Sequence, residues 1–355
     1  MAETFFIMAI DRVLNSESMN EQEDILNTSL RPTALGECIG QENVKEKLTI
    51  AMSAAKQRGE PLDHILFYGP PGLGKTTLAH VIANEMGARI KTTSGPALVK
   101  QGDVMGLLSN VSTGDILFID EIHRLSTPVE EFIYPAMEDF RVDFTVDSGM
   151  HAKTINFPLK RFTLIGATTR AGLLSSPLRG RFGMLYHLEF YSAAELAKIL
   201  TRSAKLLNLV CSPGTLELIA SRSRGTPRIA NRLLKRVRDY AQVKGEGKLT
   251  DAIVSAALKM EQIDELGLDE LDRSFLRAIA NIYNGGPAGI EALAATLGEE
   301  KDTLEDVVEP YLLQIGFVRR TKRGREITDS ACRHLGLTLK IEKQPDIQDS
   351  DEEII

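Results

Sequence analysis

The sequence is poor in cysteine and contains no apolar run long enough to cross a membrane. Its three cysteines, Cys38, Cys211 and Cys332, lie far apart and form no Cys-x-x-Cys pair. A disulfide framework or a structural zinc site is therefore not expected, and a reducing compartment fits. The apolar run at 5–10 follows an acidic residue and ends at Asp11, which is typical of neither a signal peptide nor a membrane span. We expect a cytoplasmic protein that does not enter the membrane.

An excess of positive charge is also missing, because the net charge is −7. Most of this charge lies after Lys340, where six acidic residues accompany a single lysine. The rest of the chain is nearly neutral, so the overall acidity does not exclude a nucleic acid partner that binds a local basic patch. We expect the tail, 339–355, and the leader, 1–28, to be poorly ordered.

The 355 residues are enough for two or three domains, and the sequence predicts three. Between 29 and 190, apolar strand-like runs alternate with helical patterns, which predicts an α/β domain with a parallel sheet flanked by helices. The expected strands are 64–68, 90–93, 116–119 and 162–165. Helical periodicity then continues from 191 to 262 and predicts a small all-helical domain. The expected helices there are 193–207, 213–223, 227–243 and 250–260.

The last predicted domain, 263–338, has the pattern of a winged helix-turn-helix. Helical stretches near 269–283, 289–297 and 301–314 precede a short polar hairpin that ends near Ile327. Three helices followed by a β wing are typical of this DNA-binding fold.

Residues 69–76 read Gly-Pro-Pro-Gly-Leu-Gly-Lys-Thr and match the spacing of a P-loop. The motif stands between an expected strand and an expected helix, where glycines let backbone N–H groups turn toward phosphates at a helix N-terminus. Lys75 is then expected to reach the β- and γ-phosphates of ATP, and the Thr76 hydroxyl to ligate Mg²⁺.

A pair of acidic residues, Asp120 and Glu121, comes directly after the apolar strand 116–119. Alone, such a pair is often an ordinary strand-end turn. Together with the P-loop it predicts that Asp120 holds hydrated Mg²⁺ and that Glu121 orients and polarises the attacking water.

Two further polar features follow the strand 162–165. Either Thr168 or Thr169 can sense the γ-phosphate, with Thr169 the first choice; the alternative is that both are strand-end threonines with satisfied hydroxyls. Downstream, Arg179 and Arg181 lie on an expected short helix, and an arginine there can act on the nucleotide of a neighbouring subunit.

Four strings of this sequence together resemble the RuvB family, the AAA+ ATPases that drive branch migration of Holliday junctions in bacteria. They are 69–77, 117–125, 134–139 and 166–172. The P-loop alone indicates only an NTPase, whereas the strings 117–125 and 166–172 are specific to this family. The resemblance runs from about 30 to 336 and implies an AAA+ core, a helical lid and a C-terminal winged helix.

The resemblance also implies which residues bind nucleotide. It assigns the adenine pocket and the phosphates to Leu30, Arg31, 39–41, Gly72, Lys75, Thr76 and Thr77. Further nucleotide contacts are implied for Glu138, Asp139, Phe140, Tyr191 and Arg228. Arg181 matches the arginine finger that acts in trans, in preference to Arg179. Arg228 matches the sensor-2 arginine, although with Arg224 and Arg232 it could instead form a solvated basic face.

The implied activity is ATP hydrolysis, with Mg²⁺, at the interfaces of a homohexamer that draws duplex DNA through its ring. The implied partners are four-way DNA junctions, a RuvA-type junction-binding protein that contacts the hairpin at 140–157, and a RuvC-type resolvase. A Gly-containing turn at 147–149 marks the hairpin. The plain alternative for this segment is an ordinary surface hairpin.

The expected wing carries five basic residues between 319 and 325. The family match points to Arg320 and Arg325 as contacts to the DNA backbone without sequence readout; a solvated basic loop is the alternative. The expected recognition helix carries Glu305, Asp306 and Glu309, which disfavours base-specific contacts.

Two other functions fit part of the pattern. A clamp-loader-type ATPase shares the P-loop, the acidic pair and the interfacial arginine, but more often ends in a helical collar. A nucleotide-switched DNA-binding regulator would bind ATP and hydrolyse it slowly, and Glu121 argues against it.

Overall fold

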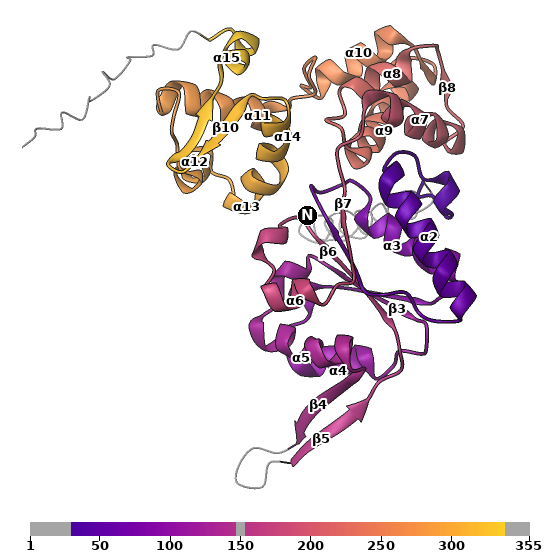
Figure 1. The fold of residues 1–355 in the computed structure, drawn as a ribbon. Coiled ribbons are helices and arrows are strands. Elements are labelled where there is room, and N and C mark those ends of the chain that lie inside the picture. Colours follow the sequence, from indigo (N-terminus) through magenta and orange to yellow (C-terminus); the bar gives the residue numbers. More distant parts are fainter. Residues whose placement is uncertain (1–29, 147–152, 338–355) are drawn as a thin grey trace, which may run out of the picture. The chain divides into compact units, whose positions relative to one another are not determined.

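The computed structural model describes residues 30–146 and 153–337 (Figure 1). The predicted leader at 1–28, the hairpin turn at 147–149 and the acidic tail at 339–355 lie outside the described residues. The chain divides into two compact units between Ala257 and Leu258. Within the described ranges, no helix has the length and apolarity needed to cross a membrane.

A five-stranded parallel sheet forms the centre of the first unit, which confirms the predicted α/β fold. Its strands, in the order β2-β3-β6-β1-β7, are Ile90–Ser94, Ile116–Asp120, Thr163–Thr168, Ile65–Tyr68 and Met184–His187. The sequence did not indicate β7, because only one of its four residues is buried and it has no continuous apolar run. Since the strands are parallel, the carboxyl ends of β1, β3 and β6 meet at one edge of the sheet.

Alternate residues of each strand face opposite sides of the sheet, and helices cover both sides. Ile65 and Phe67 of β1 pack in one apolar cluster, whereas Leu66 packs in the other. The first cluster includes residues of α2 (Glu42–Arg58) and α3 (Lys75–Met86). The second includes residues of α4 (Gln101–Leu108), α5 (Thr127–Glu138) and α6 (Ser176–Gly180).

An antiparallel hairpin of β4 (Arg141–Val146) and β5 (Lys153–Pro158) extends beyond α4 and α5 (Figure 1). Four 3₁₀ turns complete this part of the chain: η1 Leu35–Glu37, η2 Gly95–Ala97, η3 Ile122–Arg124 and η4 Ala171–Leu173.

The helices predicted between 193 and 260 are confirmed. They are α7 Ala193–Leu206, α8 Thr215–Ser221, α9 Pro227–Lys244 and α10 Asp251–Met260, and the boundary between the two units falls within α10. One correction is a short parallel pair of strands, β8 (Val210–Cys211) and β9 (Lys248–Leu249), which at two residues each are too short to show a periodicity. A second is that Arg224 is buried and precedes α9, so it does not share a helical stripe with Arg228.

The second unit has the predicted winged-helix fold. Its helices are α11 Glu270–Arg277, α12 Ile290–Leu297, α13 Lys301–Thr303, α14 Glu309–Gln314 and α15 Asp329–Leu335, and its wing strands are β10 Val318–Thr321 and β11 Gly324–Ile327. Two π-helical segments, η5 Ala278–Ile282 and η6 Leu304–Val308, follow α11 and α13. The hairpin ends at Ile327 as predicted, whereas α15 was not predicted. Phe275, Leu304, Leu312 and Ala331 are fully buried and belong to one apolar cluster of this unit.

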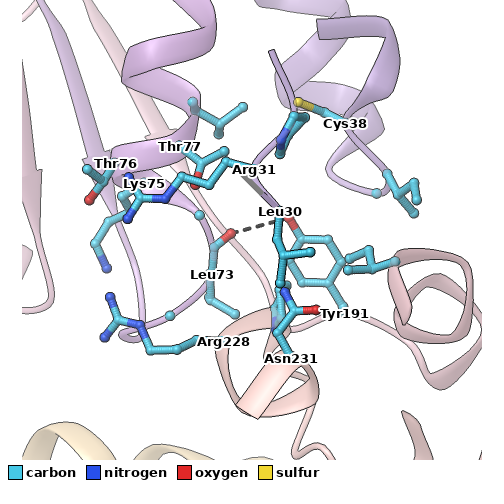
Figure 2. A pocket seen from close by; sticks show the side chains of 18 of the residues that line it. Leu30, Arg31, Cys38, Leu73, Lys75, Thr76, Thr77, Tyr191, Arg228 and Asn231 are labelled. Carbon is cyan, nitrogen blue, oxygen red and sulfur yellow. Dashed lines mark hydrogen bonds between the residues drawn. The ribbon is translucent and has the colours of Figure 1, made fainter. Parts of the chain in front are cut away.

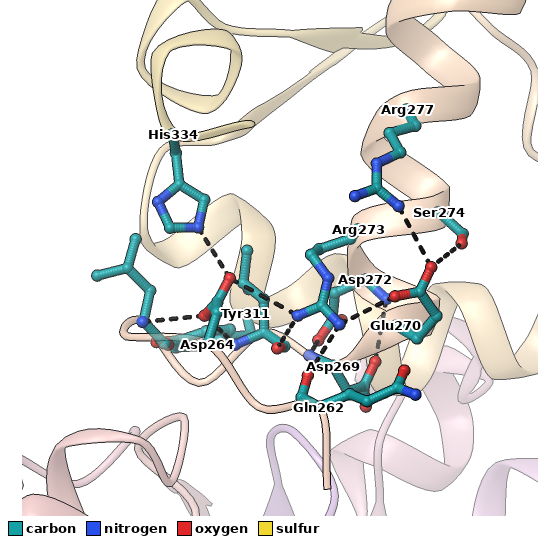
Figure 3. Close-up of polar contacts among 12 residues, drawn as sticks. Gln262, Asp264, Asp269, Glu270, Asp272, Arg273, Ser274, Arg277, Tyr311 and His334 are labelled. Atoms are coloured by element: carbon teal, nitrogen blue, oxygen red, sulfur yellow. Dashed lines mark hydrogen bonds and ion pairs between the residues drawn. The ribbon is translucent and has the colours of Figure 1, made fainter. Parts of the chain in front are cut away.

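Polar contacts fix the start of this unit (Figure 3). One oxygen of Asp264 accepts hydrogen bonds from the backbone N–H groups of Leu266 and Leu268, at 2.9 and 2.8 Å. The other oxygen lies 2.8 Å from Nε2 of His334 in α15. Arg273 of α11 donates to the carbonyl of Leu268 at 2.7 Å. The segment that enters the winged helix is thus held to both its first and its last helix.

Candidate functional site

The P-loop joins β1 to α3 in a conformation that requires glycine. Gly69 and Gly72 have φ values of 138° and 80°, which side chains with a Cβ rarely adopt. A Cβ on Gly69 would also lie 2.5 Å from the carbonyl oxygen of Leu188, and one on Gly72 would lie 2.7 Å from Thr226. Backbone lies against Gly69 and a side-chain methyl group lies against Gly72, so neither position has room for a side chain. The loop leads directly into the N-terminus of α3, where N–H groups favour an anion.

The residues predicted for phosphate and metal meet at this point. Lys75 is 7% exposed, and its ammonium group donates to the carbonyls of Gly69 and Pro70 at 2.7 and 2.9 Å. The Thr76 hydroxyl donates to a carboxylate oxygen of Asp120, at the end of β3, over 3.4 Å. A hydroxyl and a carboxylate are the oxygen ligands that a hard cation such as Mg²⁺ prefers, so these two side chains fit the metal.

Glu121 follows Asp120 and has φ 47°, a left-handed conformation that is uncommon outside glycine. Burial alone would raise the pKa of its carboxyl, but the hydrogen bond and charge of His123 and the charge of Lys75 lower that pKa below its ordinary value. The carboxylate is therefore ionised at neutral pH. Thr169 donates to its Oε2 at 3.3 Å, whereas Thr168 is fully buried and contacts His123.

A cavity of about 790 Å³ opens beside the P-loop, a volume suited to a small-molecule ligand. Side chains from the segment at 30–41, the P-loop and the helical region surround it (Figure 2). Predicted residues that line it are Leu30, Arg31, 39–41, Gly72, Lys75, Thr76, Thr77, Asp120, Glu121, Tyr191 and Arg228. The structure thus brings together most of the predicted nucleotide and metal ligands.

Two residues tie the helical region to the P-loop. The Tyr191 hydroxyl donates to the carbonyl of Leu73 at 3.2 Å (Figure 2), and burial raises the pKa of Tyr191 to about 12, so the phenol keeps its proton. At the start of α9, the N–H of Arg228 donates to the carbonyl of Gly72 at 3.4 Å. A shift of α9 would therefore move the P-loop as well.

Several residues that line the cavity were not predicted from the sequence. Arg202 of α7 donates to the carbonyls of Leu30 and Arg31, both at 3.2 Å, and to Glu37 at 3.1 Å. Others are Lys45, Ile199, Asn231, Arg232, Lys235 and Arg236. Lys45 and Ile199 lie on α2 and α7, and the other four follow Arg228 on α9. No motif marks these six positions themselves, and only folding places them beside the P-loop.

Five predicted residues lie elsewhere. Among the described residues, those lining the cavity do not include Thr169, Glu138, Asp139, Phe140 or Arg181. Arg181 forms an ion pair with Glu138 at 3.1 Å, and its guanidinium lies 4.2 Å from the centre of the Tyr134 ring. Phe140 packs against Phe162, with ring centres 5.9 Å apart. A role of Arg181 in ATP hydrolysis would thus have to be exerted on another subunit.

The two wing arginines that the sequence predicts as contacts to the DNA backbone differ from each other in exposure. The side chain of Arg325 is only 9% exposed and pairs with Glu309 at 2.9 Å and Glu305 at 3.2 Å. Arg320 is 55% exposed and lies 3.3 Å from Glu309. The acidic residues of the predicted recognition helix thus hold the wing, and Arg325 does not present its guanidinium to the outside. Arg319, Lys322 and Arg323 are exposed.

Three family models match consecutive parts of the chain. They are the Holliday junction DNA helicase RuvB P-loop domain at residues 30–188, the RuvB AAA lid domain at 191–264 and the RuvB C-terminal winged helix domain at 265–336. A solved structure of the Thermotoga maritima RuvB Holliday junction branch migration motor has 53% identity and a TM-score of 0.80, covering 87% of this chain and 99% of that one. A mutant of the same protein has 54% identity and a TM-score of 0.81, covering 87% and 98%.

Proposed function

Because the chain belongs to the RuvB family of Holliday junction branch-migration ATPases, we propose that it works as a homohexameric ring that draws duplex DNA through four-way junctions. The observation that carries this proposal is the meeting of Lys75, Asp120 and Glu121 around one cavity in a chain that also holds a winged helix. We keep the division into 29–190, 191–262 and 263–338 as the proposed domains. Chromosomal DNA and ATP are both cytoplasmic in bacteria, so we propose that location.

In the proposed site, Leu30 and Arg31 contact the adenine side of ATP, while Gly72, Lys75 and Thr77 hold its phosphates. Thr76 and Asp120 hold Mg²⁺, which when bound neutralises charge on the transferring phosphoryl group. Glu121 accepts a proton from the attacking water, and its ionised state suits that task. Tyr191 and Arg228 carry the nucleotide state to the helical lid through their contacts with Leu73 and Gly72.

Arg181 is proposed to act on the nucleotide of the adjoining subunit, with Glu138, Asp139 and Phe140 completing that contact. Its position outside the cavity of its own chain supports a role in trans. The ion pair with Glu138 and the Tyr134 ring hold its guanidinium, so the group is partly ordered before it meets a phosphate.

We propose that the β4–β5 hairpin binds a RuvA-type protein. Ile155 and Phe157 of β5 are 46% and 36% exposed, and because they are two positions apart they lie on the same face of the strand, so the hairpin offers two large apolar side chains to a partner. A RuvC-type resolvase is the proposed partner that cuts the migrated junction.

Arg320→Ala is expected to weaken binding to unrelated duplexes by similar factors. It should also make the logarithmic salt dependence shallower by about 1 unit, as one phosphate contact is lost. Affinity titrations at several salt concentrations measure this, with Arg333→Ala, which removes an exposed cation of α15 outside the basic run, as the control. An unchanged salt slope would count against a phosphate contact.

The matched buried variant, Arg325→Ala, is expected to act on stability instead. It leaves Glu309, which is 1% exposed, without its closest cation and should destabilise the winged helix by about 3 kcal/mol in thermal or denaturant unfolding. A variant with normal stability but weaker DNA binding would restore Arg325 as a DNA contact.

The proposed function is tested by ATP turnover with and without a four-way DNA junction and a RuvA-type protein. Strong stimulation by the two together is expected. Turnover that responds to neither would contradict junction-directed action.

A further inference from the structure

His123 lies between the two threonines and the acidic pair, in the 3₁₀ turn that follows β3. Its side chain is 7% exposed. Its Nδ1 atom lies 3.2 Å from Oε2 of Glu121 and 2.9 Å from the hydroxyl oxygen of Thr168, the last residue of β6. One ring nitrogen thus joins the ends of two neighbouring strands.

The groups that contact Nδ1 determine whether this nitrogen donates or accepts hydrogen bonds. An ionised carboxylate only accepts hydrogen bonds, so Nδ1 must carry a proton to satisfy Glu121. The Thr168 oxygen then accepts from the same N–H, and it also accepts from the backbone N–H of Arg170 at 3.0 Å. The hydroxyl oxygen of Thr168 therefore holds both the His123 ring and the backbone at Arg170, just after β6.

The backbone of Glu121 is fixed as well. Its carbonyl accepts from the N–H of Arg124 at 2.9 Å, and a Cβ on Gly95 would lie only 2.4 Å from that carbonyl oxygen. With the backbone in a left-handed conformation, only the side-chain torsions of Glu121 remain to be set. His123 and Thr169 both bind Oε2, which leaves Oε1 to accept a proton.

We propose that His123 is a positioning residue for Glu121, held in place by Thr168, and that it keeps Oε1 of the carboxylate directed at the attacking water. The inference rests on the proposed role of Glu121. It also separates the two threonines: Thr169 touches the carboxylate itself, whereas Thr168 acts through His123.

The test compares His123→Leu with His123→Asn, because the Asn amide can donate from nearly the place of Nδ1 while Leu cannot. His123→Leu is expected to lower kcat about 10- to 100-fold, as loss of an orienting partner does, with KM and the affinity for a fluorescent ADP analogue changed less than about 3-fold. His123→Asn should recover most of kcat. Equal losses in both variants, or a loss of affinity that matches the loss of kcat, would overturn the proposal.

One further variant keeps the result decisive if His123→Leu folds poorly. Thr168→Val has nearly the same shape, removes the acceptor for His123 and should also lower kcat with little change in ADP affinity; normal turnover would count against the proposal. In a Glu121→Gln background, His123→Leu should add no further loss, since it acts only through that carboxylate.

The same set separates this inference from the proposed function. Normal turnover by Glu121→Gln alone would contradict the catalytic role of Glu121 itself. An inactive Glu121→Gln beside a fully active His123→Leu would contradict only the positioning role.

Discussion

Lys75→Ala is expected to abolish ATP turnover together with nucleotide affinity, whereas Glu121→Gln keeps the affinity and loses turnover. The two residues line one cavity but have different chemistry: in the proposed site, the buried ammonium group of Lys75 compensates phosphate charge, whereas Glu121 takes a proton from water. Each loss of turnover should exceed about 100-fold. Binding of a fluorescent ATP analogue and steady-state hydrolysis measure the two effects separately.

Glu121→Asp is a useful companion, since it keeps the charge but moves the carboxylate back by one methylene. Turnover between those of the wild type and Glu121→Gln is expected. A Glu121→Gln protein with near-normal hydrolysis would exclude Glu121 as the base.

Arg181→Ala is expected to reduce hydrolysis in the homo-oligomer roughly 1,000-fold, the effect typical of an arginine finger, while ATP affinity is kept. Arg179→Ala, two residues earlier on the exposed side of α6, is the matched control and should remain active. Rates of phosphate release and analogue binding check both variants.

Subunit mixing shows where Arg181 acts. Arg181→Ala subunits mixed with Lys75→Ala subunits should recover part of the activity, at interfaces that pair an intact pocket with an intact finger. Full activity of Arg181→Ala alone, or no recovery on mixing, would rule out action in trans.

The central sheet could be predicted because its buried strands are continuous apolar runs, and the P-loop because its spacing is chemically constrained. Both are local patterns. The meeting of Thr76, Asp120 and Glu121 then followed from the geometry of parallel strands, whose carboxyl ends share an edge.

Other features depend on contacts between distant residues, and the sequence did not reveal them. Arg325 belongs to a basic run, but it is buried because Glu309, sixteen residues earlier, pairs with it. Arg202 reaches Leu30 across more than 170 positions. His123 is a single residue whose proposed role depends on its contact with a threonine from another strand. Composition and periodicity carry no information about such pairings.

The evidence that places the chain in the RuvB family also argues against the two alternative functions. Family models match the P-loop domain, the lid and the winged helix in order along the chain, whereas a clamp loader was expected to end in a helical collar. A nucleotide-switched regulator would have no need of an ionised Glu121 beside Thr169.

Branch migration itself tests the central claim most directly. A mobile four-way junction, with one arm labelled, is incubated with the protein, a RuvA-type partner and ATP, and the separation of the arms into two duplexes is followed over time. We predict separation that requires ATP and the partner and that stops with Glu121→Gln. Separation that proceeds equally with Glu121→Gln, or none with the wild type despite joint stimulation of ATP turnover, would contradict an ATP-driven branch-migration motor.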